Sequence, residues 1–432
     1  MPAAELSTTQ PQSPASLPVL IVGAGISGLL LAQHLSALSV PFVLLERDAS
    51  PATDRGAGWG LTLNWSLPAL RELLPPALAA RLPETYVDRA LTVKKSPRFP
   101  FYDLATGEMK GCGPVLEPER VVRVSRRRLR DLLATGLEVG WGREVLSFAE
   151  EEEECVVAHL VGGGTVVGKL MVACDGAHSR IRQALLPHAE NHLIPVGAMG
   201  LRMEHDPEQV KSLRALDPFF LHGTSSVNNS FAYFSLLETP DDPGNERGKY
   251  IVQLVVSWPL VEGFLGRPTV TTIPDTNRAR LTLIRAIAQT WADPFRQIAL
   301  ELPENTEVKP ILLDDWPPPR DFQTTGRIAL MGDAMHPMAM YRGEGANHAI
   351  VDVKEFSEHV LPSLRQDLPS SENLRGLFHR YNAAVVERAR PGVLASRRAC
   401  IDAHDWVRVG SPEVPSPLLT PRIMRLRFDE GS

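Results

Sequence analysis

Short apolar runs that end at a glycine or an acidic residue mark the main folding units of this chain. The first run, Val19–Val22, is rich in β-branched residues and is followed by a stretch of helical length, Ile26–Leu38. A second apolar run, Phe42–Leu45, ends in Glu46. Runs of this kind are typical of strands buried in a parallel sheet. The pattern therefore predicts a strand, a helix and a second strand over residues 19–46.

Three glycines separate the first strand from the helix. Gly23, Gly25 and Gly28 have the G-x-G-x-x-G spacing that is typical of dinucleotide binding when it lies between a strand and a helix. The first glycine permits a tight turn, the second lets backbone approach a pyrophosphate, and the third lets the helix pack close to the strand. The helix N-terminus would face the phosphates. Glu46 follows at the distance where an acid binds a ribose hydroxyl.

Two later apolar runs also lead into acidic residues. Thr165–Cys174 precedes Asp175-Gly176, and Ile328–Met331 precedes Gly332-Asp333. Between them, residues 191–310 contain alternating stretches such as Ser230–Leu236, which are typical of antiparallel strands. We predict an α/β protein with a Rossmann-like nucleotide-binding domain, an inserted, mainly antiparallel β-sheet domain for the substrate, and a helical C-terminal tail.

The predicted domain boundaries follow these changes in pattern. They are a disordered leader over 1–17, a first part of the nucleotide-binding domain over 18–190 with some strands of the substrate sheet near 90–115, the substrate domain over 191–310, the second part of the nucleotide-binding domain over 311–371, and a helical segment over 372–432.

Local signals predict further elements between these units. Leu67–Leu82 is predicted to be one helix with prolines at its edges, and Val121–Val124 a strand. Ser125 is a suitable N-cap for a helix over Arg126–Thr135. A run of arginines such as 126–128 is typical of a solvated helix face, but the first helical turn also suits an arginine that reaches a phosphate.

Composition narrows the class of protein. The chain has 432 residues, 44% of them hydrophobic and 22% charged, which is typical of a globular enzyme. A net charge of -6 gives no reason to expect nucleic acid or an anionic membrane as a partner. A membrane anchor over Val19–Leu35 is disfavoured by its three glycines. The sequence does not indicate an oligomeric state.

The four cysteines give no sign of a metal site or a disulfide framework. They are far apart in the chain and form no C-x-x-C or Cys/His cluster; they are Cys112, Cys155, Cys174 and Cys400. We therefore expect reduced thiols, no bound metal, and a cytoplasmic location.

Taken together, the three motifs resemble the class A flavoprotein monooxygenases, the aromatic-ring hydroxylases similar to para-hydroxybenzoate hydroxylase. The resemblance covers residues 18–361 and includes Gly343-Glu344-Gly345 after the third motif. It implies FAD as cofactor, with NADPH or NADH and O2 as co-substrates. It also implies that Asp175 and Gly176 serve both FAD and NAD(P)H, and that Asp333 binds the ribityl chain.

The same resemblance assigns further cofactor contacts. Arg126 matches an arginine that contacts the FAD diphosphate, and Gly58 lies in a mobile segment that contacts the flavin. Gly343, Gly345 and Ala346 precede or begin a helix, whose N-terminus would stabilise the negative charge of reduced flavin. The family commonly has Pro-x-x-Gly-Gln-Gly here, whereas this chain has Met340 in the proline position and Glu344 in the glutamine position.

The resemblance implies hydroxylation of a phenolic or other aromatic, natural-product-like molecule through a flavin C4a-hydroperoxide. Arg202, His222, Tyr233 and Tyr341 are candidates for polarising a phenol, although each also fits an ordinary core or surface position. Baeyer–Villiger oxidation or epoxidation by the same intermediate is one alternative. A flavin reductase or dehydrogenase that transfers no oxygen and an FAD-binding sensor are the others.

Overall fold

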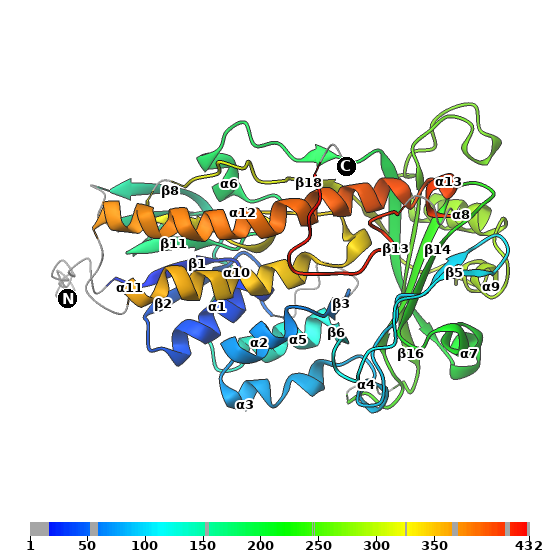
Figure 1. Cartoon of the computed structure of the whole chain (residues 1–432), viewed down its shortest axis with the longest axis horizontal. Helices are drawn as coiled ribbons and strands as arrows, with labels where there is room; N and C mark the ends of the chain where they lie inside the picture. Colours follow the sequence, from blue (N-terminus) through cyan, green and yellow to red (C-terminus); the bar gives the residue numbers. More distant parts are fainter. Residues whose placement is uncertain are drawn as a thin grey trace, which may run out of the picture.

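The structure is a computed structural model that describes residues 17–51, 59–151, 155–243, 245, 247–324, 326–364, 370–410 and 415–429. Its first layer is a parallel five-stranded sheet in the order β19-β11-β1-β2-β7 (Figure 1). The strands are β1 (Val19–Val22), β2 (Phe42–Glu46), β7 (Val139–Trp141), β11 (Leu170–Ala173) and β19 (Ile328–Leu330). Every residue of β1, the central strand, is buried, as its apolar sequence requires.

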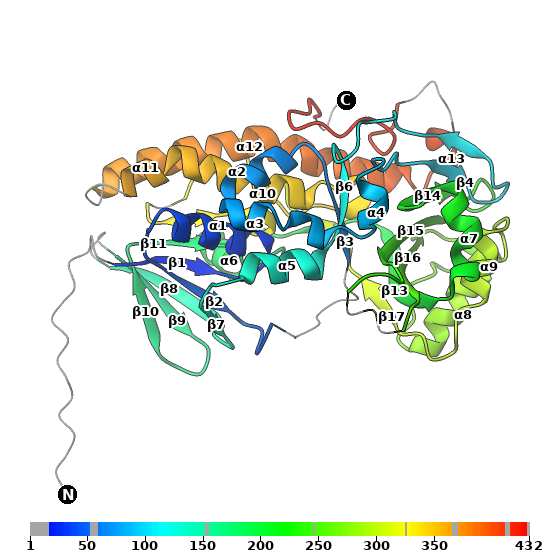
Figure 2. The same ribbon diagram turned by 90° about the horizontal axis from the view of Figure 1, so that it is seen from below.

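Helices cover one face of this sheet, and a small antiparallel sheet covers the other (Figure 2). The helices are α1 (Ile26–Ala37), α10 (Gly345–His359) and α12 (Ser371–Asp402). The small sheet has the order β10-β9-β8, with β8 (Val145–Glu151), β9 (Cys155–Leu160) and β10 (Thr165–Gly168). All five parallel strands end at one edge, which is where open sheets of this type bind ligands.

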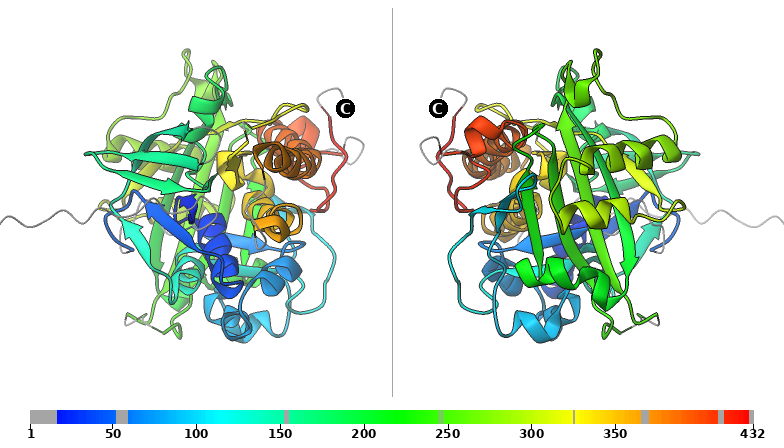
Figure 3. Two further views of the ribbon diagram at one scale, coloured as in Figure 1. Left: turned by 90° about the vertical axis from the view of Figure 1, so that its left-hand side faces the viewer. Right: turned by 90° about the vertical axis from the view of Figure 1, so that its right-hand side faces the viewer.

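The second layer is a seven-stranded sheet in the order β17-β13-β16-β15-β14-β4-β5. Its pairs are antiparallel except for β14 with β4. Its strands are β4 (Phe101–Asp103), β5 (Met109–Gly111), β13 (Val196–His205), β14 (Phe220–Thr224), β15 (Phe231–Glu238), β16 (Tyr250–Pro259) and β17 (Val308–Ile311). The outer face packs on α7 (Pro207–Leu216), α8 (Asn277–Ala288) and α9 (Phe295–Leu300) (Figure 3).

Side chains alternate in direction along each strand, so this sheet has two different faces. In β15, Ala232, Phe234 and Leu236 belong to the apolar core under α7–α9. Phe231, Tyr233 and Ser235 therefore point to the opposite side, toward the nucleotide-binding part. We call this side the inner face. The expected α/β fold, with an antiparallel insertion and a helical C-terminal region, is confirmed.

The remaining elements connect or flank the two layers. β3 (Gly60–Leu63) and β6 (Val122–Ser125) form an antiparallel pair between them. β12 (His192–Leu193) pairs with β18 (Asp314–Asp315). The shorter helices are α2 (Leu67–Leu73), α3 (Pro76–Ala79), α4 (Arg89–Thr92), α5 (Arg126–Ala134), α6 (Arg180–Leu185), α11 (Leu361–Leu364) and α13 (Trp406–Val409). The 3-10 turns are η2 (Leu82–Thr85), η3 (Phe264–Gly266), η4 (Gly332–Ala334) and η5 (Met340–Arg342).

One sequence-based element prediction is wrong. Leu67–Leu82 is two short helices, α2 and α3, because Leu74 before Pro75 adopts an extended conformation (φ −83°, ψ 145°). The segment Thr165–Cys174 contains two strands, β10 and β11, which belong to different sheets. The expected leader and Gly58 lie outside the described residues, apart from Leu17 at the leader's end. Within the described ranges, no helix combines the length and apolar composition needed to cross a membrane.

Candidate active site

The glycine turn after β1 leaves open space at the centre of the motif. Gly23 has φ +106°, and a Cβ there would lie 2.4 Å from the carbonyl oxygen of Cys174. A Cβ on Gly28 would lie 2.0 Å from the carbonyl oxygen of Gly23. By contrast, a Cβ on Gly25 would meet no atom within 4 Å. The outer two glycines therefore serve chain packing, while Gly25 borders room for a ligand.

That room is a cavity of about 590 Å³ at the strand ends. Of the predicted cofactor residues, its wall includes Gly23, Gly25, Glu46, Arg126, Asp175 and Gly176. Gly28 lies beneath the turn, and Asp333 and Gly345 lie near each other, since a Cβ on Gly345 would stand 3.7 Å from Asp333 Oδ1. The cavity wall therefore brings together predicted cofactor residues from Gly23 to Gly176, whereas Asp333 and Gly345 do not line it.

Glu46 is fixed at the end of β2 by two backbone groups. Its Oε2 accepts a hydrogen bond from the N–H of Ala24 at 2.6 Å, and its Oε1 accepts one from the N–H of Asp48 at 2.9 Å. Each carboxylate oxygen has a further lone pair. Glu46 can therefore accept a ribose hydroxyl without releasing the turn.

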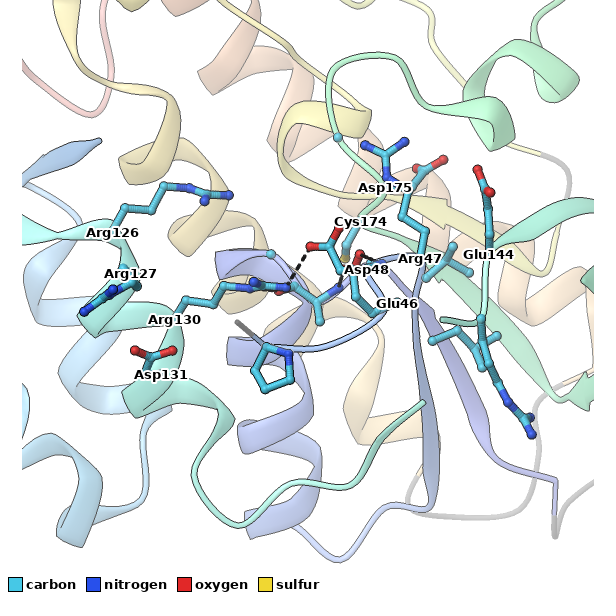
Figure 4. Close-up of a pocket in the computed structure, with 18 of the residues that line it drawn as sticks. Glu46, Arg47, Asp48, Arg126, Arg127, Arg130, Asp131, Glu144, Cys174 and Asp175 are labelled. Atoms are coloured by element: carbon cyan, nitrogen blue, oxygen red, sulfur yellow. Dashed lines mark hydrogen bonds and ion pairs between the residues drawn. The ribbon is translucent and has the colours of Figure 1, made fainter. Parts of the chain in front are cut away.

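Arginines of α5 extend toward these strand ends (Figure 4). The helix begins after Ser125, whose Oγ accepts the N–H of Arg128 at 3.4 Å, as the sequence predicts for an N-cap. Arg130 Nε donates to the carbonyl of Ala24 at 2.9 Å, and Arg130 Nη2 lies 3.3 Å from Asp48 Oδ2. Arg126 remains exposed on the cavity wall, where its guanidinium is available to a phosphate.

Arg130 is a site residue that the sequence reasoning missed. Its signal was present, because residues four apart on a helix share a face, and Arg126 and Arg130 are four apart. The arginine run obscured this pair.

Asp175 has a structural role that accompanies any cofactor role. Its Oδ2 accepts the N–H of Arg180 at 3.0 Å, at the start of α6. Ser179 is the N-cap, accepting the N–H of Arg182 at 2.9 Å. Burial raises the pKa of Asp175, against the opposing effect of these hydrogen bonds. Gly176, with φ +91°, supplies the turn between the strand and the helix.

The N-terminus of α10 forms the other end of the site. Gly343 has φ +64°, which ends η5 and allows the chain to enter the helix. Glu344 is the N-cap residue, but no side chain caps the first backbone N–H groups. Gly345 and Ala346 are the first two helical residues, so their N–H groups have no partner within the helix. A helix end of this kind suits the anionic edge of a reduced flavin.

The residue in the glutamine position of the family motif is held away from solvent. Glu344 Oε2 accepts from Arg342 Nε at 2.6 Å, and both side chains are at most 1% exposed. Glu344 Oε1 accepts from Trp65 Nε1 at 3.1 Å. Arg342 also donates to the carbonyls of Pro417 and Pro421, which ties the C-terminal segment to the start of α10.

A buried charged cluster lies behind the Gly332-Asp333 turn. Asp352 Oδ2 accepts from the N–H of Gly332 and contacts His336 Nε2, both at 2.7 Å. Arg388 pairs with the other oxygen of Asp352. Its contacts with His336 and Arg388 hold the pKa of Asp352 well below its usual range, despite its complete burial. This cluster positions the turn that carries Asp333, and its members come from three separate elements.

The four candidates for polarising a phenol occupy different places, and one of them, His222 of β14, is buried at 4% exposure. Arg202 of β13 lies on the cavity wall and pairs with Glu238 at 2.9 Å. Tyr233 lies in the middle of the inner face and is partly exposed. Tyr341 of η5 is 6% exposed, and its hydroxyl donates to Ser257 Oγ at 2.8 Å.

The contact between Tyr341 and Ser257 belongs to a longer chain of polar groups. Ser257 Oγ lies 2.9 Å from His404 Nε2, and His404 Nδ1 lies 2.7 Å from the carbonyl of Cys400. A neutral ring that donates through Nδ1 to that carbonyl accepts the serine proton through Nε2. Burial lowers the pKa of His404 to about 4, which keeps the ring neutral. The hydroxyl of Tyr341 is therefore already engaged within the protein.

The parallel sheet, the opposed antiparallel sheet, and the cavity of about 590 Å³ between the glycine turn and the arginines of α5 fit a protein that binds a dinucleotide. The FAD binding domain family model matches residues 102–238. The chain is 38% identical over 418 residues to a probable FAD-dependent monooxygenase of Arthroderma benhamiae, covering 94% of this chain and 95% of the relative. This protein belongs to the FAD-dependent monooxygenases.

Other similar proteins agree with this assignment. The chain is 35% identical over 353 residues to the FAD-dependent monooxygenase dbaB of Emericella nidulans, covering 80% of this chain and 87% of the relative. Its fold is similar to 2,6-dihydroxypyridine-3-hydroxylase from Arthrobacter nicotinovorans, with a TM-score of 0.70, 19% identity, and coverage of 97% and 100%. The resemblance to flavoprotein monooxygenases and the expectation of FAD as cofactor are confirmed.

Proposed function

We propose that this enzyme uses NAD(P)H and O2 to hydroxylate a phenolic or other aromatic small molecule of the natural-product type. The observation that carries the proposal is the contact between Tyr341 and Ser257. Tyr341 is four residues before Gly345 at the start of α10, whereas Ser257 lies on the inner face of the second sheet. The flavin end of the cofactor site and the inner face are therefore separated by little more than one side chain.

FAD, when bound, supplies hydride acceptance from NAD(P)H and activation of O2. In this proposal Glu46 holds the ribose, Arg126 the diphosphate, and Asp333 the ribityl chain. The N-terminus of α10 stabilises negative charge at Gly345 and Ala346. The aromatic residues of the inner face exclude water from the substrate during reaction.

Among the catalytic candidates, Tyr233 is best placed to meet a substrate. It is partly exposed in the middle of the inner face, and burial raises the pKa of its phenol, so it stays a hydrogen-bond donor at neutral pH. Arg202 serves at the rim of the cofactor cavity, held by Glu238. Tyr341 shapes the site with its ring, because its hydroxyl is bonded to Ser257.

None of the four cysteines forms a disulfide in the structure. Because cysteines outside disulfides are typical of reducing compartments, we infer a cytoplasmic location. Within the described part of the chain, no group of three or more His, Cys, Asp or Glu side chains is arranged to hold a metal.

The test is oxygen incorporation. FAD-loaded enzyme is screened with NADPH and NADH against phenols, indoles and polyketides, and products are analysed by mass spectrometry under isotopically labelled O2. A product that carries one labelled oxygen on its ring, and no label from labelled water, supports hydroxylation. Insertion next to a ketone indicates Baeyer–Villiger oxidation, and label on a former double bond indicates epoxidation. Label found only in hydrogen peroxide contradicts the proposal and leaves a reductase or a sensor.

A further inference from the structure

Arg123 is a buried cation that spans the two layers of the protein. It lies on β6 and is 4% exposed. Its Nη1 donates to Thr62 Oγ1 at 3.0 Å, and its Nη2 donates to Ser235 Oγ on the inner face at 2.8 Å. Its Nε is buried without a hydrogen-bond partner. The side chain therefore crosses from the nucleotide-binding part to the centre of the second sheet.

The surroundings of Arg123 contain no balancing charge. No carboxylate of the described residues forms an ion pair with it, and its two hydrogen-bond acceptors are neutral hydroxyls. Nearby arginines differ: Arg128 pairs with Asp242 at 2.7 Å, and Arg130 with Asp48 at 3.3 Å. Burying a cation without a counter-ion is unfavourable, because the group loses its hydration without gaining an opposite charge. Burial accordingly lowers the pKa of Arg123. An anion supplied by a ligand would stabilise such a cation.

Aromatic rings complete the surroundings. The Cζ atom of Arg123 lies 5.7 Å from the ring centroids of both Tyr233 and Phe220. Tyr233 is partly exposed, so the inner face is not closed beside the cation. Arg123 and Tyr233 thus offer a positive charge and a phenolic O–H donor next to an aromatic surface.

The guanidinium is also held in one place before any ligand binds. A Cβ on Gly60 would lie 2.5 Å from Nη2 and 2.6 Å from Cζ, so the backbone of β3 packs directly against the guanidinium. The two hydroxyl acceptors fix its plane from the other side. A cation fixed in this way loses little freedom when an anion binds.

We propose that Arg123 and Tyr233 bind an oxyanion carried by the aromatic substrate, either an ionised phenol or a carboxylate. This inference rests on the proposed function, since it takes the inner face as the place of the substrate. A phenol beside Arg123 has its pKa lowered by the positive charge and is bound as the phenolate, which makes its ring electron-rich. A carboxylate uses the same contacts to orient a ring that reacts elsewhere.

The test measures binding without catalysis. FAD-loaded, full-length enzyme is titrated anaerobically with 2-naphthol, 2-naphthoate and the neutral 2-naphthalenemethanol, and changes in flavin absorbance give the affinities. We expect Arg123→Gln to weaken an acidic probe about 10–100-fold, the range for a charge-assisted hydrogen bond. The affinity for the neutral alcohol should stay unchanged, and Arg123→Lys should recover part of the loss. The spectrum of bound naphtholate identifies a phenol site, whereas a loss confined to naphthoate identifies a carboxylate site.

Arg128→Gln is the matched control. Arg128 also joins the nucleotide-binding part to the second domain, but it is balanced by Asp242. The Arg128→Gln variant should bind all three probes with the same affinity as the wild type. The inference is overturned if Arg123→Gln weakens acidic and neutral probes equally, if it weakens neither, or if no acidic probe binds the wild type. Since probe binding requires neither reductant nor O2, failure of oxygen incorporation with a preserved charge preference would refute the proposed function alone.

Discussion

The carboxylate of Glu46 accepts the backbone N–H of Ala24 at 2.6 Å. This contact joins the end of β2 to the glycine turn after β1. The acid therefore fixes the glycine turn, and in the proposed site it also accepts a hydrogen bond from the FAD ribose. Loss of its side chain should affect FAD more than the global fold, because β2 keeps its strand pairing with β1 and β7.

Glu46→Ala is expected to weaken FAD binding by about 1.5–3 kcal/mol, the range for hydrogen bonds that involve a charged group. Flavin fluorescence titration of the apoprotein measures the dissociation constant. Glu144→Ala is the control, because Glu144 also lines the cavity but only pairs with Arg180 at its partly exposed edge. Equal affinities for the Glu46 and Glu144 variants would contradict the ribose assignment.

Alanine substitutions at two glycines of the G-x-G-x-x-G motif should have different effects. Gly28→Ala places a Cβ 2.0 Å from the carbonyl of Gly23, so the variant should be destabilised by several kcal/mol, about 3, as expected for overpacking a rigid core. Gly25→Ala meets no protein atom within 4 Å. It should keep its apoprotein melting temperature and lose FAD affinity. Thermal denaturation with and without FAD checks both; a Gly25 variant that binds FAD normally would contradict the position of the diphosphate.

Asp175→Ala tests whether this acid does more than support α6. Loss of the hydrogen bond to the N–H of Arg180 should cost about 0.5–2 kcal/mol, as for a helix cap. Ser179→Ala removes the neighbouring cap and should cost a similar amount. Stopped-flow reduction of bound flavin by NADPH separates the roles: we expect slower reduction for Asp175→Ala only. Equal reduction rates in both variants would leave Asp175 a purely structural residue.

The buried histidine beside Tyr341 should make the protein sensitive to acid. The pKa of His404 is lowered from 6.5 to about 4 in the folded state, so the unfolded chain takes up a proton first as pH falls. The contribution of neutral His404 to the free energy of unfolding is complete above pH 6.5 and is lost toward pH 4. The loss is about 3 kcal/mol. Urea denaturation across this range should show the fall, and His404→Gln should make it shallower. An unchanged slope in the variant would contradict the neutral buried ring.

The sequence carries the local parts of this site well. The turn at Gly23, the acid at Glu46 and the N-cap at Ser125 depend on neighbouring residues, so spacing and residue type were sufficient to predict them. The alternation in β15 likewise reveals which residues leave the apolar core.

Other features depend on contacts between distant residues, which spacing does not encode. Arg123 reaches Ser235 across 112 positions, and Arg388 reaches Asp352 from a different helix. The pairing of Glu344 with Arg342 is short in sequence, but its burial depends on carbonyls near residue 420. The break at Leu74, by contrast, has a local cause, because a residue before proline is restricted to extended conformations.

The hydrogen bonds from Arg342 to the carbonyls of Pro417 and Pro421 have a consequence for biosynthesis. The glycine turn leaves the ribosome early, whereas the carbonyls that receive Arg342 are translated after every strand of both sheets. Until they arrive, the guanidinium next to the start of α10 lacks those acceptors. On the proposed assignment of the site, the nascent chain can thus form the diphosphate end first and the flavin end last. A ribosome stalled before residue 417 should display a chain that binds FAD little better than ADP, whereas the complete chain should bind FAD more tightly.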